Sequence, residues 1–300
     1  MGRRIAAALR LPLAVVLSVV AGLSVLGLPG PAAGATGGAT EGATAAPRRV
    51  VSLSLCADQF VLALAAREQI AGLSRLAADP NLTPSAAQAS GLHRHGGTAE
   101  EILMLKPDLV VDGGFTRGRT VAMLEHLGIP VLRLRGAVTL AGILPQIDAV
   151  AAAVGQPERG RALRRSLEAR LAGAGTAPAL GTAMLYRPGG EVPGSRGIVN
   201  DVMAAAGLTN IGGRLSTRPN GRVMVEQLAL DPPDVLVVDS RRPDRPGVGQ
   251  SVLDHPALRP LAGRMREVSF PLKYWLCAGP GSIDGVALLR EAARGGGGAS

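Results

Sequence analysis

Aromatic side chains are scarce in this sequence, which has one Trp, two Tyr and three Phe among its 300 residues. The core must therefore be built mainly from aliphatic side chains, and each aromatic residue carries more information than usual. Lysine is nearly absent as well, and occurs only at Lys106 and Lys273. The many Arg residues, together with abundant Ala, Gly and Pro, indicate a compositional bias. We therefore do not interpret the formal net charge of +9 as affinity for nucleic acid.

Several catalytic signatures are missing too. The sequence has no P-loop and no H-E-x-x-H motif, and Ser282 lacks the G-x-S-x-G surroundings of a nucleophile elbow. We therefore expect no enzymatic activity, no bound metal of its own and no resident cofactor. A hydrophobic content of 47% and a charged content of 18% are typical of a soluble α/β protein, and 300 residues suffice for two domains.

The amino-terminal segment has the features of an export signal. Arg3 and Arg4 precede an apolar stretch that runs to Leu28, and Ala33-Gly34-Ala35 forms an A-x-A cleavage signature. We predict a cleavable signal peptide over residues 1–35. The alternative is an uncleaved anchor helix, because the apolar segment from Leu13 to Leu28 is long for a signal peptide.

One pattern occurs twice, in Ala99–Asp112 and in Val225–Asp239. Each copy has an early Glu, an apolar stretch with helical spacing, a Pro-Asp pair and a short hydrophobic run that ends in Asp. Each copy therefore predicts a helix that stops at Pro and leads into a buried parallel strand. A spacing this long makes the repeated unit a whole α/β lobe, since solenoid repeats are about 20 to 50 residues long.

Strands and helices are predicted to alternate through both halves, which favours parallel sheets. In the first half, Thr98 and Glu101 match the capping box that opens a helix, whereas residues 73–97 show no regular pattern. The segment Pro157–Leu171 has Leu at every fourth position from 163, with Arg and Glu between, and we predict that this helix connects the two halves.

The ordered set of segments resembles one family closely. RVVSLSLCADQ at 49–59, GTAEEILMLKPDLVV at 97–111, GIVNDVMAAAGLTNI at 197–211 and VEQLALDPPDVLVV at 225–238 are similar to the substrate-binding proteins of ABC importers for iron-siderophores, haem or cobalamin. The resemblance implies an α/β fold with two lobes of parallel sheets flanked by helices and joined by one long rigid helix. It divides the chain into a signal peptide (1–35), a flexible spacer (36–47), an amino-terminal lobe (48–138), a connector with the interlobe helix (139–173), a carboxy-terminal lobe (174–294) and a disordered tail (295–300).

In this family the ligand lies between the lobes, at the carboxyl ends of the strands, as is general for open α/β sheets. The resemblance implies capture of a metal chelate and its delivery to a permease and ATPase in the inner membrane, by a periplasmic and monomeric receptor. Aromatic residues in the loops at those ends are the first candidate contacts for a flat ligand. They are Trp275, Tyr274, Tyr186 and Phe115.

Arginine residues in the same loops suit an anionic ferric siderophore, because guanidinium groups form charge-assisted hydrogen bonds with anions. The alternative is ordinary solvated loop charge in a protein with a bias toward Arg. The candidates are Arg94, Arg117, Arg187, Arg196 and Arg222.

His93 and His95 form an H-x-H pair whose side chains point to one face of an extended segment. His95 is a candidate ligand contact, and the pair leaves open a receptor for free metal ions or a secreted metal-dependent hydrolase. Cys56 and Cys277 each lie in a loop at the cleft, one in each lobe. In an oxidising periplasm they could form a disulfide between the lobes, or their thiols could face the ligand.

Glu100 and Glu226 begin the two repeated helices. A carboxylate in the first turn of a helix favours the helix dipole, which is the plain structural explanation for both. In the resembled family, however, one exposed Glu on each lobe contacts Arg on the two permease subunits. By their spacing to Pro-Asp, Glu100 and Glu226 match those positions, and we predict that both are exposed.

Overall fold

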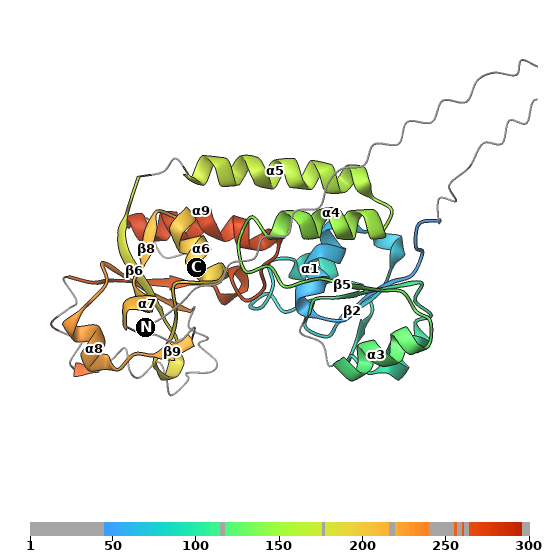
Figure 1. Cartoon of the computed structure of the whole chain (residues 1–300), viewed down its shortest axis with the longest axis horizontal. Coiled ribbons are helices and arrows are strands. Elements are labelled where there is room, and N and C mark those ends of the chain that lie inside the picture. The colour runs from blue at the N-terminus through green and yellow to red at the C-terminus, as the bar shows by residue number, and fades with distance from the viewer. Residues whose placement is uncertain are drawn as a thin grey trace, which may run out of the picture. The chain divides into compact units, whose positions relative to one another are not determined.

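The computed structural model describes residues 45–295, apart from 115–117, 176–177, 216–219, 240–254, 257–259 and 261–263. The described residues belong to one unit, Thr44–Ser300. Within it, an amino-terminal lobe and a carboxy-terminal lobe each contain a parallel sheet, and a long helix lies along both (Figure 1). The predicted fold class, two α/β lobes joined by a helix, is confirmed.

The sheet of the amino-terminal lobe has five parallel strands in the order β3-β2-β1-β4-β5. The chain starts in the middle of the sheet and later crosses to its other side, so the direction of winding reverses between β1 and β4. The strands are β1 (Val50–Ser52), β2 (Ile70–Ser74), β3 (Arg94–His95), β4 (Leu109–Asp112) and β5 (Val131–Arg133). The helices of this lobe are α1 (Leu55–Leu64), α2 (Ala99–Met104) and α3 (Gly118–His126).

The carboxy-terminal lobe repeats this plan with a parallel sheet in the order β11-β10-β6-β8. Strand β6 takes the place of β1, and β10 takes the place of β4. A separate antiparallel pair, β7 with β9, completes the lobe. Its strands are β6 (Gly181–Tyr186), β7 (Glu191–Pro193), β8 (Leu208–Asn210), β9 (Asn220–Arg222), β10 (Val235–Asp239) and β11 (Arg266–Phe270). Its helices are α6 (Ile198–Ala205), α7 (Gly212–Leu215), α8 (Val225–Leu230) and α9 (Pro280–Arg294).

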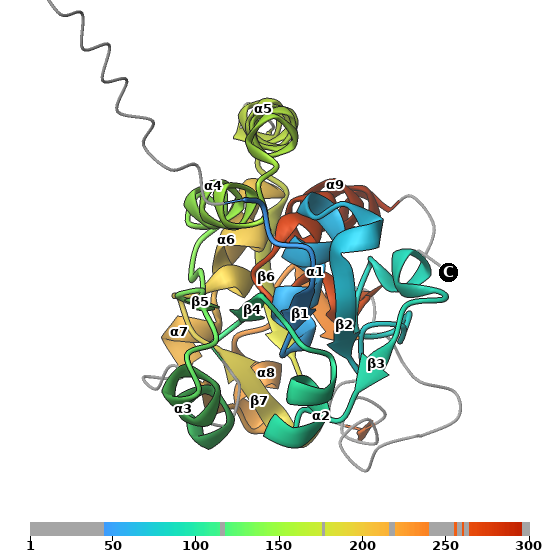
Figure 2. The same cartoon turned by 90° about the vertical axis from the view of Figure 1, so that its right-hand side faces the viewer.

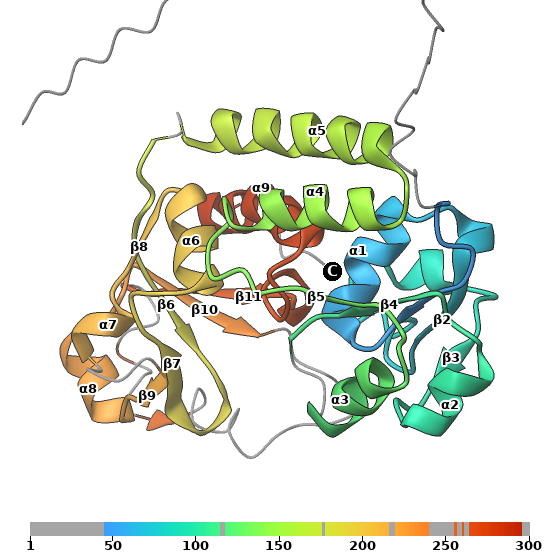
Figure 3. The same ribbon diagram turned by 45° about the vertical axis from the view of Figure 1, so that its right-hand side comes forward.

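Two helices connect the lobes, α4 (Ile143–Ala153) and α5 (Pro157–Gly175). Helix α5 lies above α4 and α9 in every view (Figures 1, 2 and 3). Gly160 allows the close approach of α5 to α4, because a Cβ placed there would lie 2.3 Å from the Cβ of Ala151. None of the helices in the described residues is long and apolar enough to cross a membrane.

The hydrophobic core explains why the two lobes form one unit. Successive residues of β10 alternate between the two faces of the sheet: Val235 and Val237 belong to the core on the side of α6 and α9, whereas Leu236 and Val238 belong to the core on the side of α8. The core on the helix side is continuous through both lobes. It includes Phe60 and Ile147 from one lobe and its connector, and Leu185 from the other.

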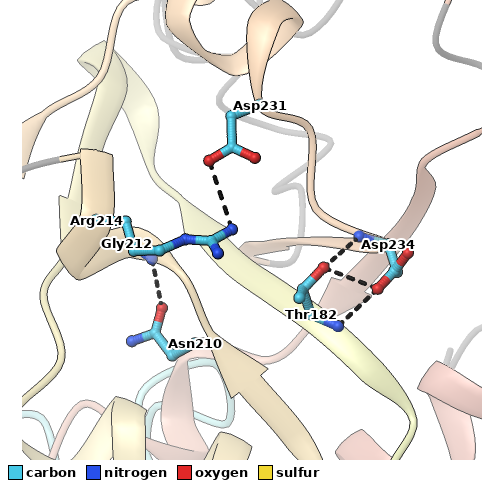
Figure 4. A network of polar contacts seen from close by, with 6 residues as sticks. All are labelled: Thr182, Asn210, Gly212, Arg214, Asp231 and Asp234. Carbon is cyan, nitrogen blue, oxygen red and sulfur yellow. Dashed lines mark hydrogen bonds and ion pairs between the residues drawn. The ribbon is translucent and has the colours of Figure 1, made fainter.

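The two Pro-Asp pairs of the repeat have the same structural role. Asp108 accepts hydrogen bonds from the backbone N–H groups of Arg48 (2.7 Å) and Arg49 (2.9 Å), just before β1. Asp234 accepts from the backbone N–H (2.7 Å) and hydroxyl (2.8 Å) of Thr182, near the start of β6 (Figure 4). In each lobe this carboxylate therefore fixes the beginning of the neighbouring central strand.

The structure confirms one local prediction from the sequence and corrects another. The predicted capping box is confirmed, with the Glu101 backbone N–H 3.3 Å from the Thr98 hydroxyl and the Thr98 N–H 3.3 Å from the Glu101 carboxylate. Helix α1 begins at Leu55, because Ser54 caps it and accepts from the N–H of Ala57. The segment 73–97, expected to be irregular, includes the end of β2 and all of β3.

Candidate functional site

The candidate site lies at the carboxyl ends of the central strands, where the winding of each sheet reverses. In the amino-terminal lobe, Gly113 follows β4 and lies directly against the start of α1. A Cβ at this position would come within 2.5 Å of the Ser54 hydroxyl and 2.9 Å of the Ala57 nitrogen. Glycine is therefore required here, and the backbone after β4 and the first turn of α1 form one surface.

The corresponding position in the carboxy-terminal lobe holds a partly buried ionic network. Asp239, the last residue of β10, accepts a hydrogen bond from the indole N–H of Trp275 at 3.0 Å. Its other carboxylate oxygen lies 3.3 Å from Nε of Arg187, which follows β6, and Arg187 also pairs with Glu191 at 3.3 Å. Burial raises the pKa of the Asp239 carboxyl, an effect that Arg187 and the Trp275 N–H partly offset. The network fixes the loop that contains Trp275 to the edge of the sheet.

A disulfide joins the two lobes at this point. Cys56, in the first turn of α1, is bonded to Cys277, and their Cα atoms are 5.2 Å apart. Nearby, the Lys273 ammonium donates to the backbone oxygen of Pro80 at 3.3 Å, a second contact between the lobes. Because both cysteines are oxidised, the alternative in which free thiols face the ligand is wrong for this structure.

A cavity of about 110 Å³ opens beside the disulfide. Both lobes contribute to its walls, and the lining is mostly apolar. A ligand bound at the junction would therefore meet a small apolar recess at its inner end. Lining residues include Cys56, Phe60, Gly113 and Leu134 from the amino-terminal side and Ile198 and Leu276 from the carboxy-terminal side.

The amino-terminal lobe has a buried polar cluster next to the site. Asp58, in the first turn of α1, accepts from the Ser74 backbone N–H at 3.1 Å and from its hydroxyl at 2.5 Å. Burial raises the pKa of Asp58 to about 6, although these hydrogen bonds oppose the change. Nε2 of His95 lies 2.9 Å from the backbone oxygen of Ser52, and burial lowers the pKa of His95. The cluster therefore holds two groups whose buried surroundings disfavour their charged forms.

Four of the predicted ligand contacts are buried, namely Cys277 of the disulfide and three residues with rings. Trp275 is only 2% exposed, and its ring packs on Phe270 with centroids 4.4 Å apart. Tyr186 is 3% exposed and donates its hydroxyl hydrogen bond to the Val223 backbone oxygen at 3.1 Å. His95 is 5% exposed. A flat ligand cannot stack on these rings in this conformation, because almost none of their surface is exposed.

The remaining candidates are more accessible but are not gathered in one place. Arg94 is exposed on β3 of one lobe, and Arg196 and Arg222 are exposed in the other. Tyr274 is partly buried, with the Lys273 ammonium 5.5 Å from the centre of its ring. Phe115 and Arg117 lie outside the described residues. Glu100 and Glu226 are both exposed, as we predicted.

Sequence reasoning missed the importance of Asp239 and Gln59. The signal for Asp239 was present, because both copies of the repeat end in Asp at the carboxyl end of a central strand. Gln59 belongs to the matching segment 49–59 but was not singled out; it is 2% exposed and lies beside Gly279 of the other lobe. Within the described residues, neither atom of its amide group has a hydrogen-bond partner.

The metal-based alternatives find no support in the described part of the chain. There, no three side chains of His, Cys, Asp or Glu are placed so that they could hold a metal ion together. His93 and His95 do lie on the same side of the lobe, since both approach Gly72. Two imidazoles without a third ligand do not make the kind of closed site that zinc prefers.

Comparison with known proteins gives relatives of one kind. A cobalamin-binding protein of Halobacterium salinarum is 27% identical over 200 residues, which cover 64% of this chain and 53% of the relative. The chain thus spans about half the length of the curated relatives that it matches.

Solved structures share the fold. A periplasmic haem-binding protein of Roseiflexus sp. RS-1 in its apo form has a TM-score of 0.66 at 24% identity, and the match covers 83% of this chain and 98% of that one. The periplasmic vitamin B12 binding protein of Vibrio cholerae has a TM-score of 0.63 at 19% identity, with the same coverage. At these identities the similarity establishes the architecture. A family model described as periplasmic binding protein matches residues 50–263, and the chain belongs to this family.

Proposed function

We propose that this protein is the receptor of an ABC importer, which binds a metal chelate between its two lobes and delivers it to a membrane permease. The observation that carries the proposal is the junction itself, where the carboxyl edges of two duplicated sheets meet across the Cys56–Cys277 disulfide. Open α/β sheets bind ligands at such edges. The family is one of binding proteins, so the role that we propose is capture and delivery without chemistry.

The ligand class follows from the relatives. The curated relatives are named cobalamin-binding proteins, and solved neighbours are named vitamin B12 binding or haem-binding proteins. We place cobalamin first, with haem and ferric siderophores as the other members of the class. The predicted signal peptide over residues 1–35 fits export across the inner membrane, and we propose the periplasm as the location.

Binding should depend on a largely preformed site. The continuous core, the helix α5 and the disulfide all resist movement of one lobe against the other. When little reorganisation is needed, more of the contact energy remains as affinity. Trp275, Arg187 and Tyr186 then act in support, by fixing the loops. Direct contacts come from the more accessible residues, for which Arg94, Arg222 and Tyr274 remain our candidates. Phe115 and Arg117, which lie outside the described residues, remain candidates from the sequence.

We also propose that Glu100 and Glu226 contact cationic groups on the two permease subunits. Both are exposed, each lies near the start of its helix, and the two helices occupy equivalent places in the two lobes. A receptor with two equivalent lobes suits a permease with two equivalent subunits.

Titration of the purified protein with cyanocobalamin, haemin and a ferric catecholate siderophore, followed by calorimetry and absorption, tests the proposal. We expect one-to-one binding of one of these classes. Leu276→Asp should weaken binding at least tenfold, because Leu276 lines the cavity and 40% of it is exposed. Leu127→Asp is the matched control. Leu127 is 51% exposed and precedes β5, so it lies near the amino ends of the strands of the amino-terminal lobe, whereas the candidate site lies at the carboxyl ends. Binding of none of the three classes would overturn the proposal.

A further inference from the structure

Aligning the two copies of the repeat on Glu100 with Glu226 and on Pro107 with Pro233 places Met104 opposite Leu230. Met104 is 74% exposed and Leu230 is 87% exposed, which are the two highest values for large apolar side chains in the described residues. A single exposed Leu or Met on a protein surface is ordinary. The recurrence of the two most exposed ones at the same position of two lobes is the observation that needs an explanation.

The helical geometry places each apolar residue beside the acidic one. Met104 follows Glu100 by four residues and Leu230 follows Glu226 by four, so each pair lies about one turn apart on the same helix face. The opposite face of each helix is anchored in the core by Ile102 or Leu228, both fully buried. Helices α2 and α8 therefore present the same surface, a carboxylate next to an apolar side chain, which we call the Glu-apolar pair.

The positions next to Met104 and Leu230 differ between the two copies. Leu103 corresponds to Ala229, Leu105 to Asp231 and Lys106 to Pro232. A shared structural need explains the buried Ile102 and Leu228, but it does not explain an apolar residue that points to solvent. The views agree that α2 and α8 lie on the side of the molecule opposite α5, one in each lobe (Figures 2 and 3).

We propose that Met104 and Leu230 are the apolar anchors of the docking surface, and that each inserts into one of two equivalent permease pockets, next to the cation that pairs with Glu100 or Glu226. This inference rests on the proposed function. The partner is the permease dimer because only a partner with two equivalent surfaces engages two identical pairs at once. Burying one such side chain should strengthen docking roughly tenfold. The carboxylates set the orientation of docking, and their electrostatic contribution to the affinity is weakened by salt.

The test uses the permease and ATPase complex in lipid nanodiscs and measures its affinity for the full mature receptor at low and high salt. The double variant Met104→Gln/Leu230→Gln should lose at least tenfold in affinity at both salt concentrations. Glu100→Gln/Glu226→Gln should instead lose most of its affinity at low salt and show a shallower salt dependence. Val138→Gln is the matched control, because Val138 is 68% exposed and lies outside the repeat, between β5 and α4.

Chelate titration of every variant separates this inference from the proposed function. The Met104→Gln/Leu230→Gln receptor should bind the chelate as the parent does and stay folded, since both side chains are already in solvent. If this variant docks as tightly as the parent, or if Val138→Gln loses as much affinity, the apolar anchors are wrong and the receptor function stands. If the parent itself does not dock, the proposed function fails and the inference fails with it.

Discussion

At the scale of one residue, burial next to the site changes the pKa of the Asp58 carboxyl group. The carboxyl group is fully buried in the first turn of α1 and has only hydroxyl and backbone partners, with Ser74 the closest. A buried carboxylate without a cation is costly, so protonation is favoured. The pKa of Asp58 is accordingly raised from 3.8 to about 6.

The pH dependence of stability follows from this shift. Because the folded-state pKa of Asp58 lies above its unfolded value, its contribution to stability is fully present below pH 3.8 and is lost as the pH rises through about 6. The loss should be on the order of 2 to 3 kcal/mol. Asp58→Asn should remove it, so that the difference in unfolding free energy between parent and variant changes between pH 4 and 7.

Urea denaturation at a series of pH values measures this difference. Asp231→Asn controls for removal of an exposed carboxylate, which in the parent pairs with Arg214 at 3.4 Å. A difference between the parent and Asp58→Asn that stays constant with pH would contradict the assignment.

At the scale of single residues, the sequence predicted a local hydrogen-bond pattern better than the burial of a side chain. The Thr98 and Glu101 capping box was predictable because it depends on local spacing alone. The burial of Trp275 was not predictable, because it depends on contacts with Asp239 at the end of β10 and with Phe270 at the end of β11. Its place in a predicted loop at the strand ends suggested a ring open to ligand, and only the tertiary structure shows that the loop folds back onto the sheet.

At the scale of the element, α5 depends on its small residues. Gly160 is buried where α5 approaches α4, whereas a Cβ added at Gly173 of the same helix would meet no atom within 4 Å. The two positions share one helix and differ in packing, so they separate the effect of close contact from that of helix propensity.

Replacing Gly with Ala should change the unfolding free energy in opposite directions at these two positions. Gly160→Ala should lower the unfolding free energy by about 1 to 3 kcal/mol, because its Cβ would overlap Ala151 and force the helices apart. Gly173→Ala should raise it by about 0.5 to 1 kcal/mol, through better helix propensity. Chemical denaturation of both variants is the measurement, and shifts of the same sign would show that packing at Gly160 does not limit the approach of α5.

The repeated helix and strand were predictable as elements because their signals are local. Pro107 and Pro233 end the helices, and the runs that follow are long enough to indicate strands. Strands β2 and β3 escaped prediction because neither has a continuous β-branched run: β2 reads IAGLS, and β3 has only Arg94 and His95. Their strand character comes from pairing in the sheet and not from their own sequence.

At the scale of the whole molecule, the two lobes act as one body. A core that is continuous through both lobes and the helix α5 hold them together, and the disulfide closes a loop across a sequence separation of 221 residues. A crosslink of this span destabilises the unfolded chain by roughly 5 kcal/mol in the chain-entropy model. The duplication and the connector were readable from the sequence, but the disulfide was one of two options for Cys56 and Cys277. The placement that decided between them is a property of the assembled lobes.

Anomalous diffraction from crystals of the receptor with its bound chelate, recorded at the cobalt or iron edge, tests the central claim most directly. We predict one strong metal peak between the carboxyl ends of β1 and β4 in one lobe and of β6 and β10 in the other, near the Cys56–Cys277 disulfide. The position of the two lobes should be nearly the same with and without the chelate. A metal peak at the amino edge of either sheet, or on the outer surface of a single lobe, would contradict the account.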